Sequence, residues 1–268
     1  MRKCEMQQSR KMQSEYNNGD LTGYSGQFIR SALLFGTEGI ERLAGCRVAV
    51  FGLGGVGGNA VEALARSGIG ALDLIDNDTI SISNINRQLF ALHSTVGRYK
   101  VDVAAERIHD INPFAVVRTY RCFFLPDTAD QFDFSQYDYV VDAIDTVTGK
   151  LEIICQAVSC GVPVISCMGT GNKTDPSALR VSELFDTKGD PLARVMRKEL
   201  RKRGITSLKV ICSEEEPMTP DAELEKMCME ELGEGSSRRS VPGSTAFVPP
   251  AAGLLIAGTV VKELLNNS

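Results

Sequence analysis

The strongest constraint on the fold is a glycine-rich turn that joins an apolar run to an amphipathic one. Residues 47–52 read RVAVFG, and Gly52, Gly54 and Gly57 then follow the spacing G-x-G-x-x-G. The β-rich run predicts a strand, and the apolar spacing over residues 59–70 predicts a helix that ends at its glycines. Backbone N–H groups at the start of such a helix are suited to bind a phosphate or a nucleotide. The stretch therefore predicts a strand–turn–helix ligand site.

Apolar runs and amphipathic segments continue to alternate along most of the chain. Further strands are expected at 72–76, 116–124, 137–145, 162–169 and 208–213, and further helices at 100–113, 150–161 and 190–204. This alternation predicts an α/β fold, a doubly wound, mostly parallel, Rossmann-like sheet with a C-terminal extension of helix and strand. In such a sheet the ligand binds at the carboxyl ends of the strands.

Composition suggests where the ordered domain begins and ends. Residues 1–24 are polar and are expected to form a flexible tail, and 217–240, rich in acids, Pro and Gly, a mobile acidic insert. The remaining residues, 25–216 and 241–268, are expected to form a single domain. The apolar run 246–261 is shorter than the roughly 20 residues of a membrane-spanning helix. We therefore expect a buried C-terminal helix and no membrane span.

Charge and cysteine usage exclude some classes of protein. The 29 basic and 34 acidic residues give a net charge of −5, which argues against general polyanion binding, and so against DNA, but permits a local basic face. None of the eight cysteines forms a C-x-x-C pair, so a thiolate zinc site is not indicated. Several lie in apolar runs, as reduced buried thiols do, and no signal peptide is recognisable. A cytoplasmic protein is expected.

Polar side chains after the second expected strand distinguish between two nucleotides. Asp76 ends that strand, where an acid binds ribose hydroxyls, and alone it would suggest NAD. A second acid and a polar cluster follow at Asp78, Asn84, Arg87, Gln88 and Lys100. A triphosphate attacked at its α-phosphorus needs such cations for the leaving pyrophosphate and a carboxylate for Mg²⁺. We therefore expect ATP, with Asp145, at the end of the fourth strand, as the metal carboxylate. No P-loop motif occurs.

Five stretches in combination resemble the ubiquitin-activating-like adenylating enzymes, the family that includes MoeB and ThiF. They are VFGLGGVG, LIDNDTISISNINRQ, TVGRYKVD, INP and VVDAIDT, within about 40–170. The resemblance implies an ATP-binding adenylating domain. The adenosine end would be lined by Gly55, Asp76 and Asp78, beside the turn of Gly52, Gly54 and Gly57; the phosphates by Asn84, Arg87, Gln88 and Lys100; and Mg²⁺ would be held by Asp145.

One more stretch, FIRSALLFG at 28–36, resembles the segment that contributes an arginine across a dimer interface in this family. The resemblance implies a homodimer in which Arg30 acts in the neighbouring subunit. Arg30, Arg87, Lys100 and Asp145 would then be the catalytic residues.

The rest of the chain resembles one branch of that family, the tRNA threonylcarbamoyladenosine dehydratases. The matching stretches are MGTGNKTDP, DPLARVMRKELRKRGI, LKVICSEEEP and PGSTAFVPPAAGLLIAG, which extend the resemblance over about 28–216 and 240–265. The implied reaction is ATP-dependent cyclisation of threonylcarbamoyladenosine in tRNA through an acyl-adenylate. Many relatives have Cys where this chain has Asp190, and some have a Cys-rich stretch where it has only Cys228. A sulfur-transfer partner or relay therefore stays open.

The segment 192–203 offers a physical argument for RNA. Five of its six basic residues fall at helical positions i, i+3, i+4, i+7 and i+8: Arg194, Arg197, Lys198, Arg201 and Lys202. Such a stripe on one helix face suits tRNA phosphates and predicts binding that weakens with salt. Leu192, Val195, Met196 and Leu200 would pack on the other side. A solvated charged face is the alternative interpretation.

Three other functions compete with the tRNA enzyme. An activator of a ubiquitin-like or sulfur-carrier protein C-terminus would share the ATP site, but would be expected to carry C-x-x-C motifs or a transferring Cys. An NAD oxidoreductase leaves the Arg and Lys cluster without a role. An ATP-binding scaffold without activity is disfavoured by the intact set of matching residues.

Overall fold

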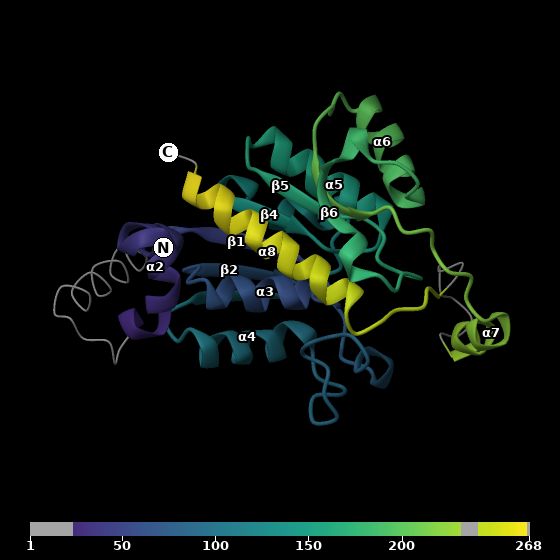
Figure 1. Cartoon of the computed structure of the whole chain (residues 1–268), viewed down its shortest axis with the longest axis horizontal. Coiled ribbons are helices and arrows are strands. Elements are labelled where there is room, and N and C mark those ends of the chain that lie inside the picture. The colour runs from purple at the N-terminus through teal and green to yellow at the C-terminus, as the bar shows by residue number, and fades with distance from the viewer. Residues whose placement is uncertain (1–23, 232–240, 267–268) are drawn as a thin grey trace.

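The computed structural model describes residues 24–231 and 241–266, so the expected tail lies outside the described residues except for its last position. The helices are α2 (Tyr24–Gly45), α3 (Gly57–Arg66), α4 (Lys100–Ile111), α5 (Val147–Ser159), α6 (Pro191–Lys202), α7 (Ala222–Glu231) and α8 (Val248–Asn266). The strands are β1 (Arg47–Phe51), β2 (Ala71–Ile75), β3 (Val116–Tyr120), β4 (Tyr139–Asp142), β5 (Val164–Cys167), β6 (Leu179–Glu183) and β7 (Lys209–Ser213). Figure 1 shows helices on both faces of one central sheet.

The seven strands form one sheet in the order β3-β2-β1-β4-β5-β7-β6. Only β6 runs antiparallel, paired with β7 at the edge. The strand order reverses between β1 and β4, which pair in parallel from Val48 with Tyr139 to Phe51 with Asp142. The Rossmann-like, doubly wound fold is thus confirmed, and the reversal marks the place where a parallel sheet opens a crevice for a ligand.

Alternate residues of the central strands feed two apolar cores. In β1, Val48 and Val50 face the core that α3, α4 and α8 cover, whereas Ala49 and Phe51 face the core beneath α5 and α6. Every residue of β1 is buried, as expected of a central strand covered on both sides. The sheet is therefore a rigid platform, and the loops at its carboxyl edge are what can vary.

Helix α8 is the apolar C-terminal run, and it crosses the sheet next to α3 (Figure 1). A Cβ added at Gly253 would meet the carbonyl oxygen of Val56 at 2.3 Å, so the two helices pack at close range. In the described part of the chain this is the one helix long and apolar enough to cross a membrane by length and composition, and half of its apolar window is buried inside the protein. Ile256 and Val260 are fully buried, which is the packing expected of an interior helix.

Several elements differ from the sequence-based expectation. The third strand ends at Tyr120 rather than 124, because the chain then leaves the sheet. Neither α2 nor β6 was assigned in advance; β6 is a short edge strand with Arg180 and Val181 exposed, so its apolar pattern is weak. Within the expected mobile insert 217–240 the structure forms α7, which stands apart from the sheet layers in Figure 1. Residues 232–240 lie outside the described part.

Candidate functional site

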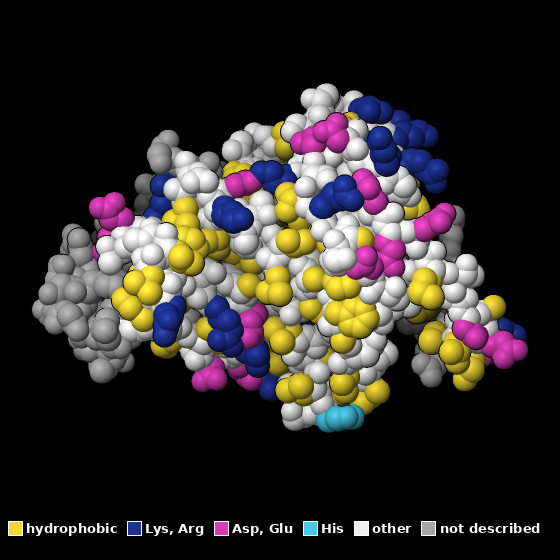
Figure 2. All heavy atoms as spheres, in the orientation of Figure 1, with side chains coloured by type: hydrophobic (Ala, Val, Ile, Leu, Met, Phe, Trp, Pro, Cys, Tyr) yellow, Lys and Arg dark blue, Asp and Glu magenta, His cyan; other side chains and the backbone are white. Residues whose placement is uncertain are grey.

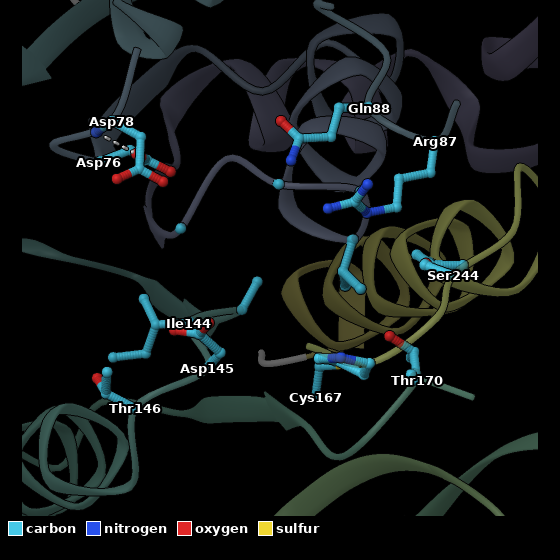
Figure 3. A pocket seen from close by; sticks show the side chains of 18 of the residues that line it. Asp76, Asp78, Arg87, Gln88, Ile144, Asp145, Thr146, Cys167, Thr170 and Ser244 are labelled. Atoms are coloured by element: carbon cyan, nitrogen blue, oxygen red, sulfur yellow. Dashed lines mark hydrogen bonds between the residues drawn. The ribbon is translucent and has the colours of Figure 1, made fainter. Parts of the chain in front are cut away.

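A pocket of about 580 Å³ opens at the carboxyl edge of the sheet, where the strand order reverses. It is lined by the loops that follow β1, β2, β3, β4 and β5, together with Asn84, Arg87, Gln88, Lys100 and the segment 241–244. Of the expected ATP-site residues, ten line it: Gly52, Gly54, Gly55, Asp76, Asp78, Asn84, Arg87, Gln88, Lys100 and Asp145. Figure 3 shows Asp76 and Asp78 at one end and Arg87 at the other.

The glycine turn is built from two different kinds of glycine. Gly52 has φ +89°, which favours glycine, and its N–H donates to the Ile75 carbonyl at 2.8 Å. Gly57 does not line the pocket: a Cβ there would lie 1.8 Å from the Gly52 oxygen, so this residue packs α3 against the turn. Gly54 and Gly55 line the pocket, but a Cβ at Gly55 would lie 2.9 Å from the Pro249 Cβ, whereas at Gly54 the nearest atom is the Gln88 amide nitrogen at 3.9 Å. The absence of a side chain at Gly54 therefore leaves room for a ligand to approach the main chain closely.

The acidic end of the pocket is organised around Asp76. Its carboxylate accepts the Leu53 N–H at 2.7 Å and the Asp78 N–H at 2.8 Å. Burial raises the pKa of Asp76 above its ordinary value, while Lys100 and the two backbone N–H donors oppose that rise. The buried Lys100 ammonium donates to Asp78 at 2.6 Å and lies 3.8 Å from Asp76. Lys100 therefore sits with the acids rather than beside Arg87.

The opposite end carries the other expected phosphate ligands. The Arg87 guanidinium donates to the Ser83 carbonyl at 2.7 Å and to the Asn86 side-chain oxygen at 2.8 Å. Asn84 ends a short 3-10 turn (Ile82–Asn84) and accepts the Ser81 N–H, which fixes the shape of this loop. These bonds orient Arg87 at the pocket wall.

A buried ionic network lies beneath the floor that carries Asp145. The Lys150 ammonium, 1% exposed, donates to Asp142 at 3.0 Å and to the Cys167 carbonyl at 2.7 Å. Asp142 in turn accepts the Ile144 N–H at 3.3 Å, directly before Asp145. The network ties the ends of β4 and β5 together, so it holds the loop that presents Asp145.

A further wall of the pocket was not foreseen from the sequence. It comprises Cys122–Phe124, Gly169–Gly171 and Val241–Ser244. The first two groups follow β3 and β5, so the rule that ligands bind at strand ends could have identified them. Nothing in the sequence indicates that 241–244, which comes from a distant part of the chain, returns to this place. Figure 3 shows Thr170 and Ser244 near the Arg87 end.

Two groups of expected functional residues lie away from the pocket. Arg30 is exposed on α2 and does not line the pocket of its own chain. The basic residues of α6 form a visible group in Figure 2. Within that group Arg197 is half-buried and donates to the Thr187 carbonyl at 2.9 Å, and Arg201 lies over the Phe185 ring. Arg194, Lys198 and Lys202 are exposed.

The packing side of α6 also differs in part from expectation. Met196 and Leu200 are buried, but Val195 is 43% exposed and the partly buried Leu192 reaches the pocket. Asp190 caps the helix by accepting the Ala193 N–H at 2.9 Å, and it pairs with the buried Lys173 at 3.4 Å. These contacts set the helix beside the pocket.

Comparison with known proteins places this geometry in a family. The ThiF family model matches residues 26–267. A tRNA threonylcarbamoyladenosine dehydratase of Bacillus subtilis is 43% identical over 242 residues, 90% of this chain and 95% of that protein. One from Escherichia coli is 33% identical over 253 residues, 90% of this chain and 94% of that protein. The solved structure of E. coli TcdA with ATP superposes with a TM-score of 0.79 at 31% identity, covering 91% of this chain and 95% of that one. The chain therefore belongs to the ThiF family.

Proposed function

We propose that this protein is an ATP-dependent enzyme that dehydrates threonylcarbamoyladenosine in tRNA to its cyclic form. The observation that carries the proposal is the pocket itself, which joins a glycine turn, paired acids and Arg87 at the edge of the sheet. The relatives with which the chain aligns over nine-tenths of its length bear the name of that activity, and E. coli TcdA was solved with ATP and with AMP.

The proposed reaction has two steps that balance. The carboxylate of the threonyl group attacks the α-phosphorus of ATP, the bond to the β-phosphate breaks, and pyrophosphate leaves. The carbamoyl group of the same substrate then attacks the acyl carbon of the adenylate, loses a proton and expels AMP. Because the second nucleophile is intramolecular, holding the arm in place supplies much of the rate. The net change in the nucleoside is the loss of water.

Each part of the pocket has a role in that proposal. The Asp76 carboxylate accepts hydrogen bonds from ribose hydroxyls, Gly55 lines the adenosine end, and the main chain at Gly54 approaches the phosphates. Arg87, with Asn84 and Gln88, stabilises the charge that develops on the leaving pyrophosphate. Lys100 links the acidic end to the phosphates.

A magnesium ion fits the residues present. No cluster of three or more His, Cys, Asp or Glu side chains suited to a metal occurs in 24–231 or 241–266, so a cage built from protein ligands alone is not indicated there. Mg²⁺ is commonly held by one or two carboxylates together with substrate phosphates, and Asp145, which lines the pocket, is the carboxylate proposed for this role. When bound, the ion would neutralise charge on the triphosphate.

The decisive experiment is mass spectrometry of nucleosides from tRNA incubated with the protein and ATP. Wild-type protein should convert threonylcarbamoyladenosine to a product lighter by one water, with one AMP formed per product. Arg87→Ala and Asp145→Ala should each reduce AMP formation by roughly 10²-fold or more while the protein stays folded. An unchanged nucleoside would contradict the proposal, and exchange of pyrophosphate into ATP that requires an added ubiquitin-like or sulfur-carrier protein instead of tRNA would favour a protein C-terminus as the substrate.

The role of Arg30 requires a homodimer, and the exposed apolar side chains of α2 support one. Leu33 and Leu34 are 73% and 80% exposed, next to Arg30 on the same helix. A mixture of inactive Arg30→Ala and inactive Asp145→Ala proteins should regain activity, because some mixed dimers contain one intact site. Absence of rescue at any mixing ratio would contradict a role across the interface.

The exposed bases of α6 are proposed to bind tRNA phosphates. Reversing Arg194 and Lys198 to Glu should weaken tRNA binding and lower its dependence on salt, and should leave ATP affinity unchanged. Arg197→Glu should also destabilise the fold, because its guanidinium holds the Thr187 carbonyl. Equal loss of tRNA and ATP binding in the Arg194 and Lys198 variant would mean that the helix is structural.

The seven described cysteines are free thiols, which suits the reducing cytoplasm.

A further inference from the structure

The wall segment Val241–Ser244 belongs to an excursion that leaves the domain after β7 and returns to the pocket before α8. Both ends of this excursion meet at one residue, Asn172. The Asn172 carbonyl accepts the Met218 N–H at 2.7 Å, close to where the excursion begins. The Asn172 N–H donates to the Gly243 carbonyl at 2.8 Å, and its side-chain oxygen accepts the Gly243 N–H at 2.6 Å, where the excursion ends. One residue thus closes the loop.

The local backbone is specialised for this contact. Asn172 has φ +59°, and among the described residues it is the one non-glycine residue with positive φ. Asn adopts that conformation more readily than most residues, and here the hydrogen bonds to Gly243 and Met218 stabilise it. A Cβ at the preceding Gly171 would lie 2.7 Å from the Pro242 Cβ. The two main chains are therefore in close contact at Gly171 and bonded at Asn172.

The start of the excursion is fixed on the same loop. The Glu215 carboxylate accepts the Thr174 N–H at 2.7 Å and the Asp175 N–H at 3.0 Å. These backbone hydrogen bonds, of which the one from Thr174 contributes most, lower the pKa of Glu215 and so favour the ionised carboxylate that accepts them. The loop after β5 thus holds the excursion where it leaves and where it returns.

The far side of the wall segment is bonded to the phosphate end of the pocket. The Asn86 side-chain NH₂ donates to the Ser244 carbonyl at 3.1 Å, while its side-chain oxygen accepts from Arg87 at 2.8 Å. Asn172 and Asn86 therefore hydrogen-bond to the short segment Val241–Ser244 from its two sides. Hydrogen bonds thus connect Asn172 to Gly243, and Ser244, the next residue in the chain, to Asn86 and Arg87.

We infer that Asn172 and Asn86 are positioning residues that hold Val241–Ser244 as the substrate-facing wall of the pocket. Figure 3 shows why this wall matters: Ser244 and Thr170 lie near Arg87, away from the acids assigned to the adenosine. The inference places the acyl arm of the modified adenosine against this wall, beside the phosphates, and so rests on the proposed function for its substrate. A loosened wall should impair the tRNA-dependent step and leave ATP binding intact.

The chain offers matched variants that test each grip. Asn172→Gly keeps the positive φ but removes the oxygen that accepts from Gly243, whereas Asn172→Asp keeps an acceptor at the same place. Asn86→Asp keeps the acceptor for Arg87 and removes the donor to Ser244. Losing one hydrogen bond of this kind should lower kcat/KM for tRNA about fivefold in Asn172→Gly and in Asn86→Asp. The Kd for ATP without tRNA should stay within about twofold in Asn172→Gly, which does not touch Arg87, and Asn172→Asp should recover most of the activity.

Two further readouts separate positioning from a general loss of structure. In the double variant Asn172→Gly with Asn86→Asp, the loss should be smaller than the product of the single losses, because both residues hold one segment. Amide hydrogen exchange followed by NMR should speed up at Gly243 in Asn172→Gly and stay unchanged at Met218, whose acceptor is a backbone oxygen that glycine retains. In Asn172→Asp, exchange should stay unchanged at Gly243 as well as at Met218.

These experiments distinguish failure of the inference about the wall segment from failure of the proposed function. Unchanged exchange at Gly243 in Asn172→Gly, or an equal loss of ATP and tRNA binding, would overturn the inference. If wild-type protein leaves threonylcarbamoyladenosine intact, the proposed function fails. The exchange measurement, which needs no tRNA, would then still decide whether Asn172 holds the wall.

Discussion

The two kinds of glycine in the turn should respond oppositely to alanine. A Cβ at Gly57 would lie 1.8 Å from the Gly52 oxygen and 3.3 Å from the Ala143 Cβ, so backbone must move to admit it. Overpacking costs about 1–3 kcal/mol where side chains can yield, and we expect at least about 3 kcal/mol against main chain. At about 2–4 °C per kcal/mol, Gly57→Ala should lower Tm by roughly 6–12 °C. At Gly54 the nearest atom is the Gln88 amide nitrogen at 3.9 Å, so alanine fits there.

The assay pairs thermal unfolding with ATP titration by calorimetry. Gly54→Ala should unfold within about 2 °C of wild type, but its methyl group would occupy the space where the main chain approaches phosphate, and ATP affinity should fall roughly tenfold or more. Gly45→Ala, where no atom lies within 4 Å of the new methyl group, is the neutral control. A wild-type Tm for Gly57→Ala would refute the packing argument. Wild-type ATP affinity for Gly54→Ala would refute the placement of the phosphates.

Two further predictions concern buried groups. Lys150→Met should lower Tm by about 10 °C, since removing one partner of a buried ion pair costs about 3–5 kcal/mol and leaves Asp142 unpaired; a wild-type Tm in thermal unfolding would contradict this. Burial raises the pKa of Cys167 to about 12, so at pH 8 this thiol should stay unlabelled by a disulfide reagent while the exposed Cys160 and Cys228 react. Peptide mapping that finds Cys167 modified in the native protein would refute its protection.

Elements defined by local pattern were predictable from the sequence. Gly52 and Asp76 each stand at the end of a short apolar run. The carboxyl ends of parallel strands meet at one edge of the sheet, so these two residues are expected to lie close together. The ATP end of the pocket follows from that rule alone. The same rule would have located Gly169–Gly171 had it been applied to the fifth strand.

The rest depends on contacts between distant parts of the chain. Val241–Ser244 carries no apolar periodicity, and what brings it to the pocket is pairing with Asn172 and Asn86, about 70 and 160 residues away in sequence. Arg197 was expected to share the exposed stripe of α6, but its neighbours along the helix could not reveal that Thr187 supplies an acceptor beneath it. A helical wheel shows the faces of one helix and gives no information on the hydrogen-bonding groups of the loop that packs against it.

The charged side chains that line the pocket of one chain do not balance the negative charge of a bound triphosphate. Its lining carries three carboxylates, Asp76, Asp78 and Asp145, against two cations, Arg87 and Lys100, and Lys100 already contacts two of the acids. The amino end of α3 adds about half a positive charge. A triphosphate brings several more negative charges, so these groups leave an excess that a divalent ion at Asp145 would only partly offset. In the proposed homodimer an arginine from the second subunit would offset part of that excess, which is a physical reason to test whether Arg30, exposed on α2 beside Leu33 and Leu34, acts in the neighbouring pocket.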